Sequence, residues 1–210
     1  RRQRQMCIRD SADTVKGCFL GQAGDWCTTP AQSINYASCH DNMTLLDRIS
    51  RSTPGVSEED RIRMNNLSAV IYMTAQGIPF LQAGEEMLRT KIDASGGFVE
   101  NSYNSPDSVN SIKWDTLEDE AYQNVYNYYK GLIAFRKAHA ALRLTNAADV
   151  NANITSVDGL DDNVLAFRIN GGVNGETSDG IFVIFNPNSA ETSVALPDGA
   201  WDVCLSLIHI

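Results

Sequence analysis

Two stretches of the chain place ionisable residues directly after a short apolar run. His40-Asp41-Asn42 follows residues 33–38, and Gly84-Glu85-Glu86 follows residues 78–83. In parallel α/β proteins, ligands bind beyond the carboxyl ends of the strands. If both runs are strands, the two triplets open onto one face, where carboxylates and an imidazole can hydrogen-bond a polar ligand.

Each triplet also has a purely structural interpretation. His40 and Asp41 can simply cap the turn into the next segment, because Asp and Asn commonly do so. Glu85 and Glu86 can be a solvated acidic pair, and residues 101–107 can be an ordinary surface loop. The residue types alone leave both interpretations open.

Helical patterns flank the second triplet. Ser57 can cap a helix over residues 58–76, whose acidic first turn suits the helix dipole, and Gly77 suits its C-terminal end. Residues 118–139 predict a second, amphipathic helix. Its apolar face is expected to hold Tyr122, Val125, Tyr129, Leu132, Ile133 and Phe135.

The segments between these helices complete a β-α-β-α series. Residues 33–38 and 78–83 are predicted as short buried strands, and a polar loop follows from residue 84 to about 117. Such a series favours parallel strands in an α/β sheet or barrel. A loop of this length inside a compact domain is usually functional.

The pattern changes character near residue 142, beyond which helical periodicity is lost. Short apolar runs separated by Gly, Asn, Asp and Pro are typical of an antiparallel β-domain. The chain stops before a sandwich closes, so an incomplete domain is expected. The predicted strands are residues 163–169, 180–186, 191–197 and 200–204, and Trp114 and Trp201 are expected in the core or between domains.

Both ends of the chain are expected to be artefacts. Residues 1–10 and 205–210 can be back-translated into the two ends of a transposase-type sequencing adapter. The hypothesis is that genuine protein runs from Ser11 to Cys204. The alternative, a basic N-terminal arm, does not explain the match at the other end.

Charge and cysteine spacing exclude several classes of function. Leaving out residues 1–10, with four arginines and one aspartate, changes the formal net charge from −9 to −12. That balance argues against nucleic-acid binding. The cysteines from Cys18 onward match no zinc pattern, and the aspartates at 158–162 match no calcium loop. We therefore expect neither a metal nor a cofactor, and we assign no compartment.

Four sequence stretches together resemble the C-terminal part of type I pullulanases, in the α-amylase superfamily. They are "INYASCHDN", "GIPFLQAGEE", "ENSYNSPDSVNSIKWD" and "YYKGLIAFRKAHAALRL". The resemblance implies an α/β fold: strands 7 and 8 of a (β/α)₈ TIM barrel with their helices over residues 11–141. An antiparallel all-β domain, truncated, would follow over residues 142–204.

The same resemblance implies an α-glucan substrate, such as pullulan, branched dextrins, amylopectin or glycogen. The family cleaves α-1,6 bonds with retention, using three carboxylates, of which only the third maps onto this chain, at Asp41. Asp41 is then the transition-state stabiliser, and the isolated chain, from a bacterial-type enzyme, is expected to be inactive. The substrate-binding residues expected beside it are His40, Asn42, Asn101, Tyr103 and Asn104.

Three competing interpretations stay open. An α-1,4-acting amylase or transglycosylase of the same superfamily shares the barrel, although residues 101–107 favour the debranching type. A non-catalytic carbohydrate-binding protein would lack the two upstream carboxylates. A plain structural α/β module would bind no glucan at all.

Overall fold

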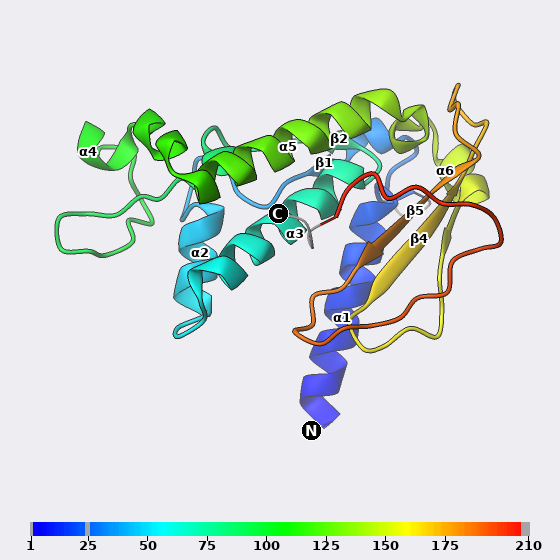
Figure 1. Cartoon of the computed structure of the whole chain (residues 1–210), viewed down its shortest axis with the longest axis horizontal. Helices are drawn as coiled ribbons and strands as arrows, with labels where there is room; N and C mark the ends of the chain where they lie inside the picture. The colour runs from blue at the N-terminus through cyan, green and yellow to red at the C-terminus, as the bar shows by residue number, and fades with distance from the viewer. Residues whose placement is uncertain (1, 24–25, 207–210) are drawn as a thin grey trace. The chain divides into compact units, whose positions relative to one another are not determined.

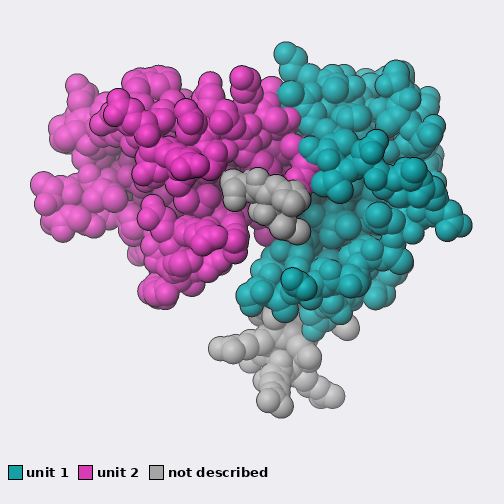
Figure 2. Space-filling view, in the orientation of Figure 1, with its two compact units in different colours: residues 1–35, 71–79, 134–204 teal, residues 36–70, 80–133, 205–210 magenta. Residues whose placement is uncertain are grey.

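The computed structural model describes residues 2–23 and 26–206 and divides the chain into two compact units. Unit 1 combines residues 1–35, 71–79 and 134–204, and unit 2 combines residues 36–70, 80–133 and 205–210 (Figure 2). Helices α3 and α5 each belong partly to both units. The elements are α1 (Arg2–Phe19), η1 (Pro30–Gln32), β1 (Ile34–Asn35), α2 (Leu45–Ser52), α3 (Glu58–Thr74), β2 (Ile78–Pro79), η2 (Glu85–Met87), α4 (Asp107–Asn110), η3 (Trp114–Glu118), α5 (Glu120–Ala138), η4 (Ala140–Arg143), α6 (Ala147–Asn153), β3 (Ile154–Ser156), β4 (Leu165–Asn170) and β5 (Gly180–Phe185) (Figure 1).

The two strands expected in the N-terminal half pair in parallel, as predicted. In unit 1, Ile34 of β1 lies opposite Ile78 of β2. Each strand has only two residues, and these two side chains are 59% and 47% exposed, so the prediction of buried strands was wrong. In the described part of the chain this sheet has no third strand, which leaves both side chains uncovered.

The two long helices form where their patterns predict. Ser57 caps α3, because its hydroxyl accepts a hydrogen bond from the amide of Asp60 at 3.1 Å. Helix α5 buries Val125, Tyr129 and Leu132, whereas Ile133, expected on the same face, is largely exposed. Capping and periodicity therefore identified both helices. The apolar face was predicted less well, because Tyr128, which was not expected on it, is also buried.

The antiparallel sheet of unit 1 confirms two of the four strands predicted beyond residue 142. Strand β4 pairs with β3 and β5, and α1 lies against this sheet (Figure 1). Phe19 of α1 stacks on Phe167 with ring centroids 4.0 Å apart, and Phe185 packs edge-on against Phe19. The core of this part is thus an aromatic cluster shared by helix and sheet.

Several expectations for the same region were wrong. Residues 191–197 and 200–204 form no strand. Trp201 packs its ring against Phe182 and donates to the carbonyl of Pro197. Helix α6, capped by Asn146, and strand β3 form where no element was predicted. The side chain of Asn146 accepts a hydrogen bond from the amide of Asp149, so this cap could have indicated α6, although the helix is too short to show a clear apolar periodicity.

The long polar segment after β2 is more ordered than its composition predicts. Helices η2, α4 and η3 lie within it, and Ile92 and Phe98 form an antiparallel bridge. Trp114, expected in the core or between domains, is 65% exposed. Within the described ranges no helix has the length and apolar character needed to cross a membrane.

The expected artefacts and domain boundary stay predictions. Residues 2–10 belong to helix α1, whereas residue 1 and residues 207–210 lie outside the described part of the chain. The compact units group segments that are distant in sequence, so they do not test a boundary at residue 142.

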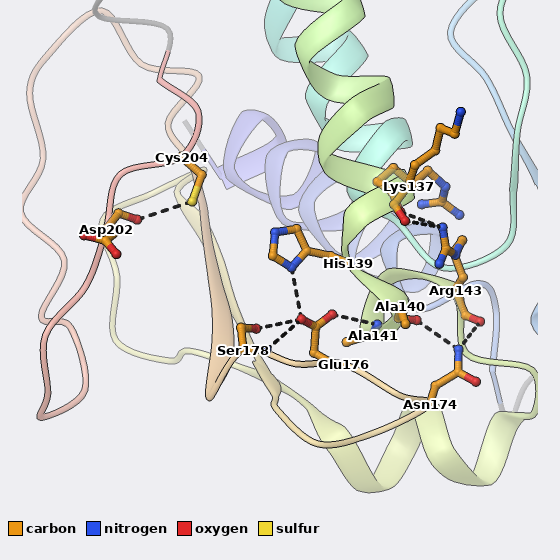
Figure 3. A network of polar contacts seen from close by, with 11 residues as sticks. Lys137, His139, Ala140, Ala141, Arg143, Asn174, Glu176, Ser178, Asp202 and Cys204 are labelled. Carbon is orange, nitrogen blue, oxygen red and sulfur yellow. Dashed lines mark hydrogen bonds and ion pairs between the residues drawn. The ribbon is translucent and has the colours of Figure 1, made fainter.

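A buried carboxylate holds the β4–β5 connection of unit 1 in place (Figure 3). The side chain of Glu176 is fully buried and contacts Nδ1 of His139 at 3.1 Å. Glu176 also accepts hydrogen bonds from the amide of Ala141 and from both the amide and hydroxyl of Ser178. Burial opposes the charged form, but these hydrogen bonds outweigh it and lower the pKa of Glu176 from 4.5 to about 2.

We predict that Glu176→Gln destabilises the chain at neutral pH by about 2–3 kcal/mol, because charge-assisted hydrogen bonds are lost. The folded pKa lies below the unfolded one, so this stabilisation is complete above pH 4.5 and is lost as the pH falls towards 2. Urea unfolding of the parent and of Glu176→Gln at several pH values measures the difference in their free energies of unfolding. A difference that stays constant down to pH 2 would contradict the lowered pKa of Glu176. The control is Glu191→Gln, at an exposed residue.

Candidate functional site

The triplet His40-Asp41-Asn42 forms an exposed turn of unit 2. Nε2 of His40 lies 3.5 Å from Oδ2 of Asp41, and their side chains are 88% and 75% exposed. Asn42 has a φ of 63°, in the left-handed region that Asn tolerates better than most residues. The turn therefore presents an imidazole and a carboxylate side by side towards solvent.

A cavity of about 220 Å³ in unit 2 brings this turn together with the long loop. Four of the six residues predicted for the site line it: His40, Asp41, Asn101 and Tyr103. Six lining residues were not predicted as site residues: Gln82, Arg89, Lys91, Glu100, Ser102 and Asn110. Gln82 lies three residues beyond β2 but inside the strand predicted over residues 78–83, so the rule that ligands bind beyond strand ends did not identify it.

Two predicted residues do not line the cavity. Asn42 contributes its main-chain carbonyl to the turn rather than a lining side chain. Asn104 is exposed in the turn that carries Tyr103. The structure thus places the turn and the tip of the long loop around one space without using every polar residue of either.

The loop that carries Tyr103 is fixed by polar side chains at its base. Nδ2 of Asn110 donates to the carbonyls of Ser102, at 2.6 Å, and Ser105, at 3.1 Å. Arg89 donates to the carbonyls of Asn110 and Ala83. Tyr103 itself is 85% exposed, which leaves its ring open for stacking.

Glu85 is buried and hydrogen-bonded, so its interpretation as part of a solvated acidic pair was wrong. Its carboxylate accepts hydrogen bonds from the hydroxyl of Ser38 at 2.6 Å and the hydroxyl of Tyr129 at 3.0 Å. Tyr129 in turn accepts one from Asn65 at 3.1 Å. Ser38 lies just before the His40–Asn42 turn. The buried hydrogen bonds of Glu85 therefore fix the chain next to one side of the cavity.

The lining groups define the chemistry that the cavity can perform. Asp41 and Glu100 offer acceptors, Arg89 and Lys91 offer cationic donors, and Tyr103 offers an aromatic face. Dense mixed donors and acceptors beside an exposed ring suit a polyhydroxyl ligand. Among the described residues, no cluster of His, Cys, Asp and Glu has the composition of a metal site.

We predict that Tyr129→Phe lowers the free energy of unfolding by about 1–3 kcal/mol, because Glu85 loses a buried hydrogen-bond donor. Urea unfolding measures the loss. Tyr126→Phe on the same helix is the matched control, because Tyr126 is 39% exposed, and is expected within about 0.5 kcal/mol of the parent. Equal losses in the two variants would show that the hydroxyl of Tyr129 stabilises nothing.

Comparisons with known proteins show that most of this chain is similar to the sequences of pullulanases. Residues 150–206 match the family model described as the pullulanase all-beta domain. The pullulanase of Bacillus subtilis (strain 168) is 39% identical over 166 residues, which cover 76% of this chain and 22% of that protein. The chain therefore spans about a fifth of the length of this relative.

Pullulanases are also among the solved structures that resemble this chain. The pullulanase from Bacillus acidopullulyticus matches with a TM-score of 0.83 and 38% identity, covering 90% of this chain and 22% of that one. The pullulanase from Paenibacillus barengoltzii, in complex with maltohexaose and alpha-cyclodextrin, matches with a TM-score of 0.81 and 40% identity. That match covers 88% of this chain and 28% of the solved one.

Proposed function

We propose that this chain, a homologue of the C-terminal part of type I pullulanases, forms one wall of the substrate site of an α-glucan debranching glycoside hydrolase. The observation that carries the proposal is the cavity in unit 2. It gathers His40 and Asp41 from one segment with Asn101 and Tyr103 from another, around about 220 Å³. The solved relative that holds maltohexaose supports a glucan as the ligand.

Asp41 is the residue proposed to act on the reacting sugar. A retaining glycosidase passes through an oxocarbenium-like transition state, in which hydrogen bonds to the ring hydroxyls strengthen. The exposed carboxylate of Asp41 can accept from two adjacent hydroxyls, and such charge-assisted bonds are strong. It therefore serves as a transition-state stabiliser rather than as a nucleophile or proton donor.

The other predicted residues act in binding. His40 donates to a neighbouring sugar oxygen, and Tyr103 provides a stacking surface at the cavity rim. Asn101 offers an amide to hydroxyls. Asn42 acts through its position in the turn, and Asn104 through the loop tip that it shares with Tyr103.

The proposal assigns the nucleophile and the acid/base carboxylate to sequence outside this chain. We predict that the isolated 210-residue chain does not hydrolyse pullulan, whereas the product of the upstream-extended gene releases maltotriose by cleaving α-1,6 bonds. Product analysis on pullulan measures both. Hydrolysis by the isolated chain would refute the division of residues, and α-1,4 products alone would favour an amylase.

In that full-length enzyme we predict that Asp41→Asn lowers kcat by several orders of magnitude and leaves KM nearly unchanged. The amide keeps the size of the carboxylate but removes the charge that strengthens hydrogen bonds in the transition state. Steady-state kinetics on pullulan measures both constants. Asp115→Asn, at an exposed residue outside the cavity lining, is the control. A change in KM alone would make Asp41 a binding residue only.

A further inference from the structure

One buried cation joins the two carbonyls that flank Asp41. Lys91 is 2% exposed, and its Nζ donates to the carbonyl of His40 at 3.1 Å and to that of Asn42 at 3.3 Å. Both carbonyls therefore converge on one nitrogen, with Asp41 between them. The left-handed φ of Asn42 provides the sharp change of chain direction at this point.

The main chain of Lys91 is itself fixed by a second buried charge. Its amide donates to Oδ2 of Asp47 at 2.8 Å, and Asp47 is fully buried in the first turn of α2. The hydroxyl of Thr44 caps that turn by accepting from the amide of Asp47 at 3.2 Å. The carbonyl of Lys91 accepts from the amide of Val99 at 2.8 Å. The ammonium thus extends from a backbone that is anchored on both sides.

This arrangement is unfavourable for both charges. Burial is the largest influence on Lys91 and lowers its pKa, and nearby Arg89 acts in the same direction. Burial likewise raises the pKa of Asp47, against the hydrogen bonds from Lys91 and Thr44. Buried charges stabilise a fold poorly compared with apolar groups of the same volume. Stability alone is therefore a weak reason for an ammonium at this position.

We propose that Lys91 is the positioning residue of this site: it clamps the His40–Asn42 turn so that Asp41 keeps the orientation its task requires. The inference rests on the proposed function. The side chain of Asp41 is 75% exposed, and its neighbour in the turn, the imidazole of His40 at 3.5 Å, is 88% exposed. Its direction is therefore set by the main chain, and a displacement of about 1 Å can reduce catalysis about 100-fold.

A direct role in binding is the competing explanation, because Lys91 also lines the cavity. An ammonium has three donors, and two are engaged by the carbonyls of His40 and Asn42. If the third contacts the sugar in the ground state, its loss raises KM. If Lys91 acts through Asp41, its loss lowers kcat and leaves KM nearly unchanged.

The kinetic test compares Lys91→Met, Lys91→Arg and Lys113→Met in the full-length enzyme acting on pullulan. Lys113 is the matched control, because its exposed Nζ also donates to a main-chain carbonyl, that of Asp107 at 3.2 Å. We expect Lys91→Met to lower kcat about 10- to 100-fold with KM within about twofold. Lys91→Arg should recover part of kcat, because a guanidinium can also donate to two carbonyls, and Lys113→Met should match the parent.

A structural readout on the 210-residue chain accompanies the kinetics. Backbone ¹⁵N order parameters at residues 40–42 should fall from about 0.85 towards 0.6 in Lys91→Met and stay unchanged in Lys113→Met. Unchanged order parameters, or an unchanged kcat, would overturn the clamp. A rise in KM alone would make Lys91 a binding residue instead.

Two further outcomes are distinguishable. If Lys91→Met does not fold, the same measurements are made on Lys91→Arg. Lower order parameters at residues 40–42 with an unaltered kcat would refute the positioning role. A lower kcat with an unchanged KM would support it. An inactive parent enzyme would refute the proposed function, and order parameters at residues 40–42 would then still test whether Lys91 holds the turn.

Discussion

Buried main-chain carbonyls at the ends of short elements are the constraint on which the rest of the structure depends. Strands of two residues satisfy few of their own polar groups, and an unpaired buried carbonyl is costly. Long side chains supply the missing donors. In unit 1, Arg136 donates to carbonyls in the last turn of α3 and just after it, those of Met73, Ala75 and Gly77, and burial lowers its pKa to about 10. Gln76 donates to Ala141 in the same unit.

Unit 2 uses the same solution where the proposed chemistry is located. Lys91 satisfies two carbonyls of the His40–Asn42 turn, and Arg89 satisfies those at the base of the loop that carries Tyr103. Asp41 and Tyr103, which also line the cavity, therefore do not have to stabilise the main chain themselves. Asp41 and Tyr103 are themselves exposed. The buried Lys91 and the partly buried Arg89 hold the main chain next to them.

The parts of the fold that were predictable from sequence are those with a local cause. The cap at Ser57, the periodicity of α5 and the alternation in β4 and β5 act within a few residues, and each identified its element. Burial of β1 and β2 was not predictable, because it depends on neighbours distant in sequence. The strands predicted within residues 191–204 were wrong. Their apolar residues suit a strand, but the contact of Trp201 with Phe182, which is distant in sequence, could not be predicted from the local pattern. Position after a predicted strand singled out Asp41, whose role stays a prediction, whereas no local pattern distinguishes Lys91 from a solvated lysine.

The way Lys91 reaches Asp41 has a chemical advantage over a direct ion pair. An ammonium bonded to the carboxylate would occupy the lone pairs that sugar hydroxyls need and would weaken every charge-assisted bond to the substrate. Binding the carbonyls on either side of Asp41 fixes the same residue through its backbone and leaves the carboxylate oxygens accessible. A buried cation that binds the main chain on both sides of Asp41 can thus orient the carboxylate without competing for its ligand.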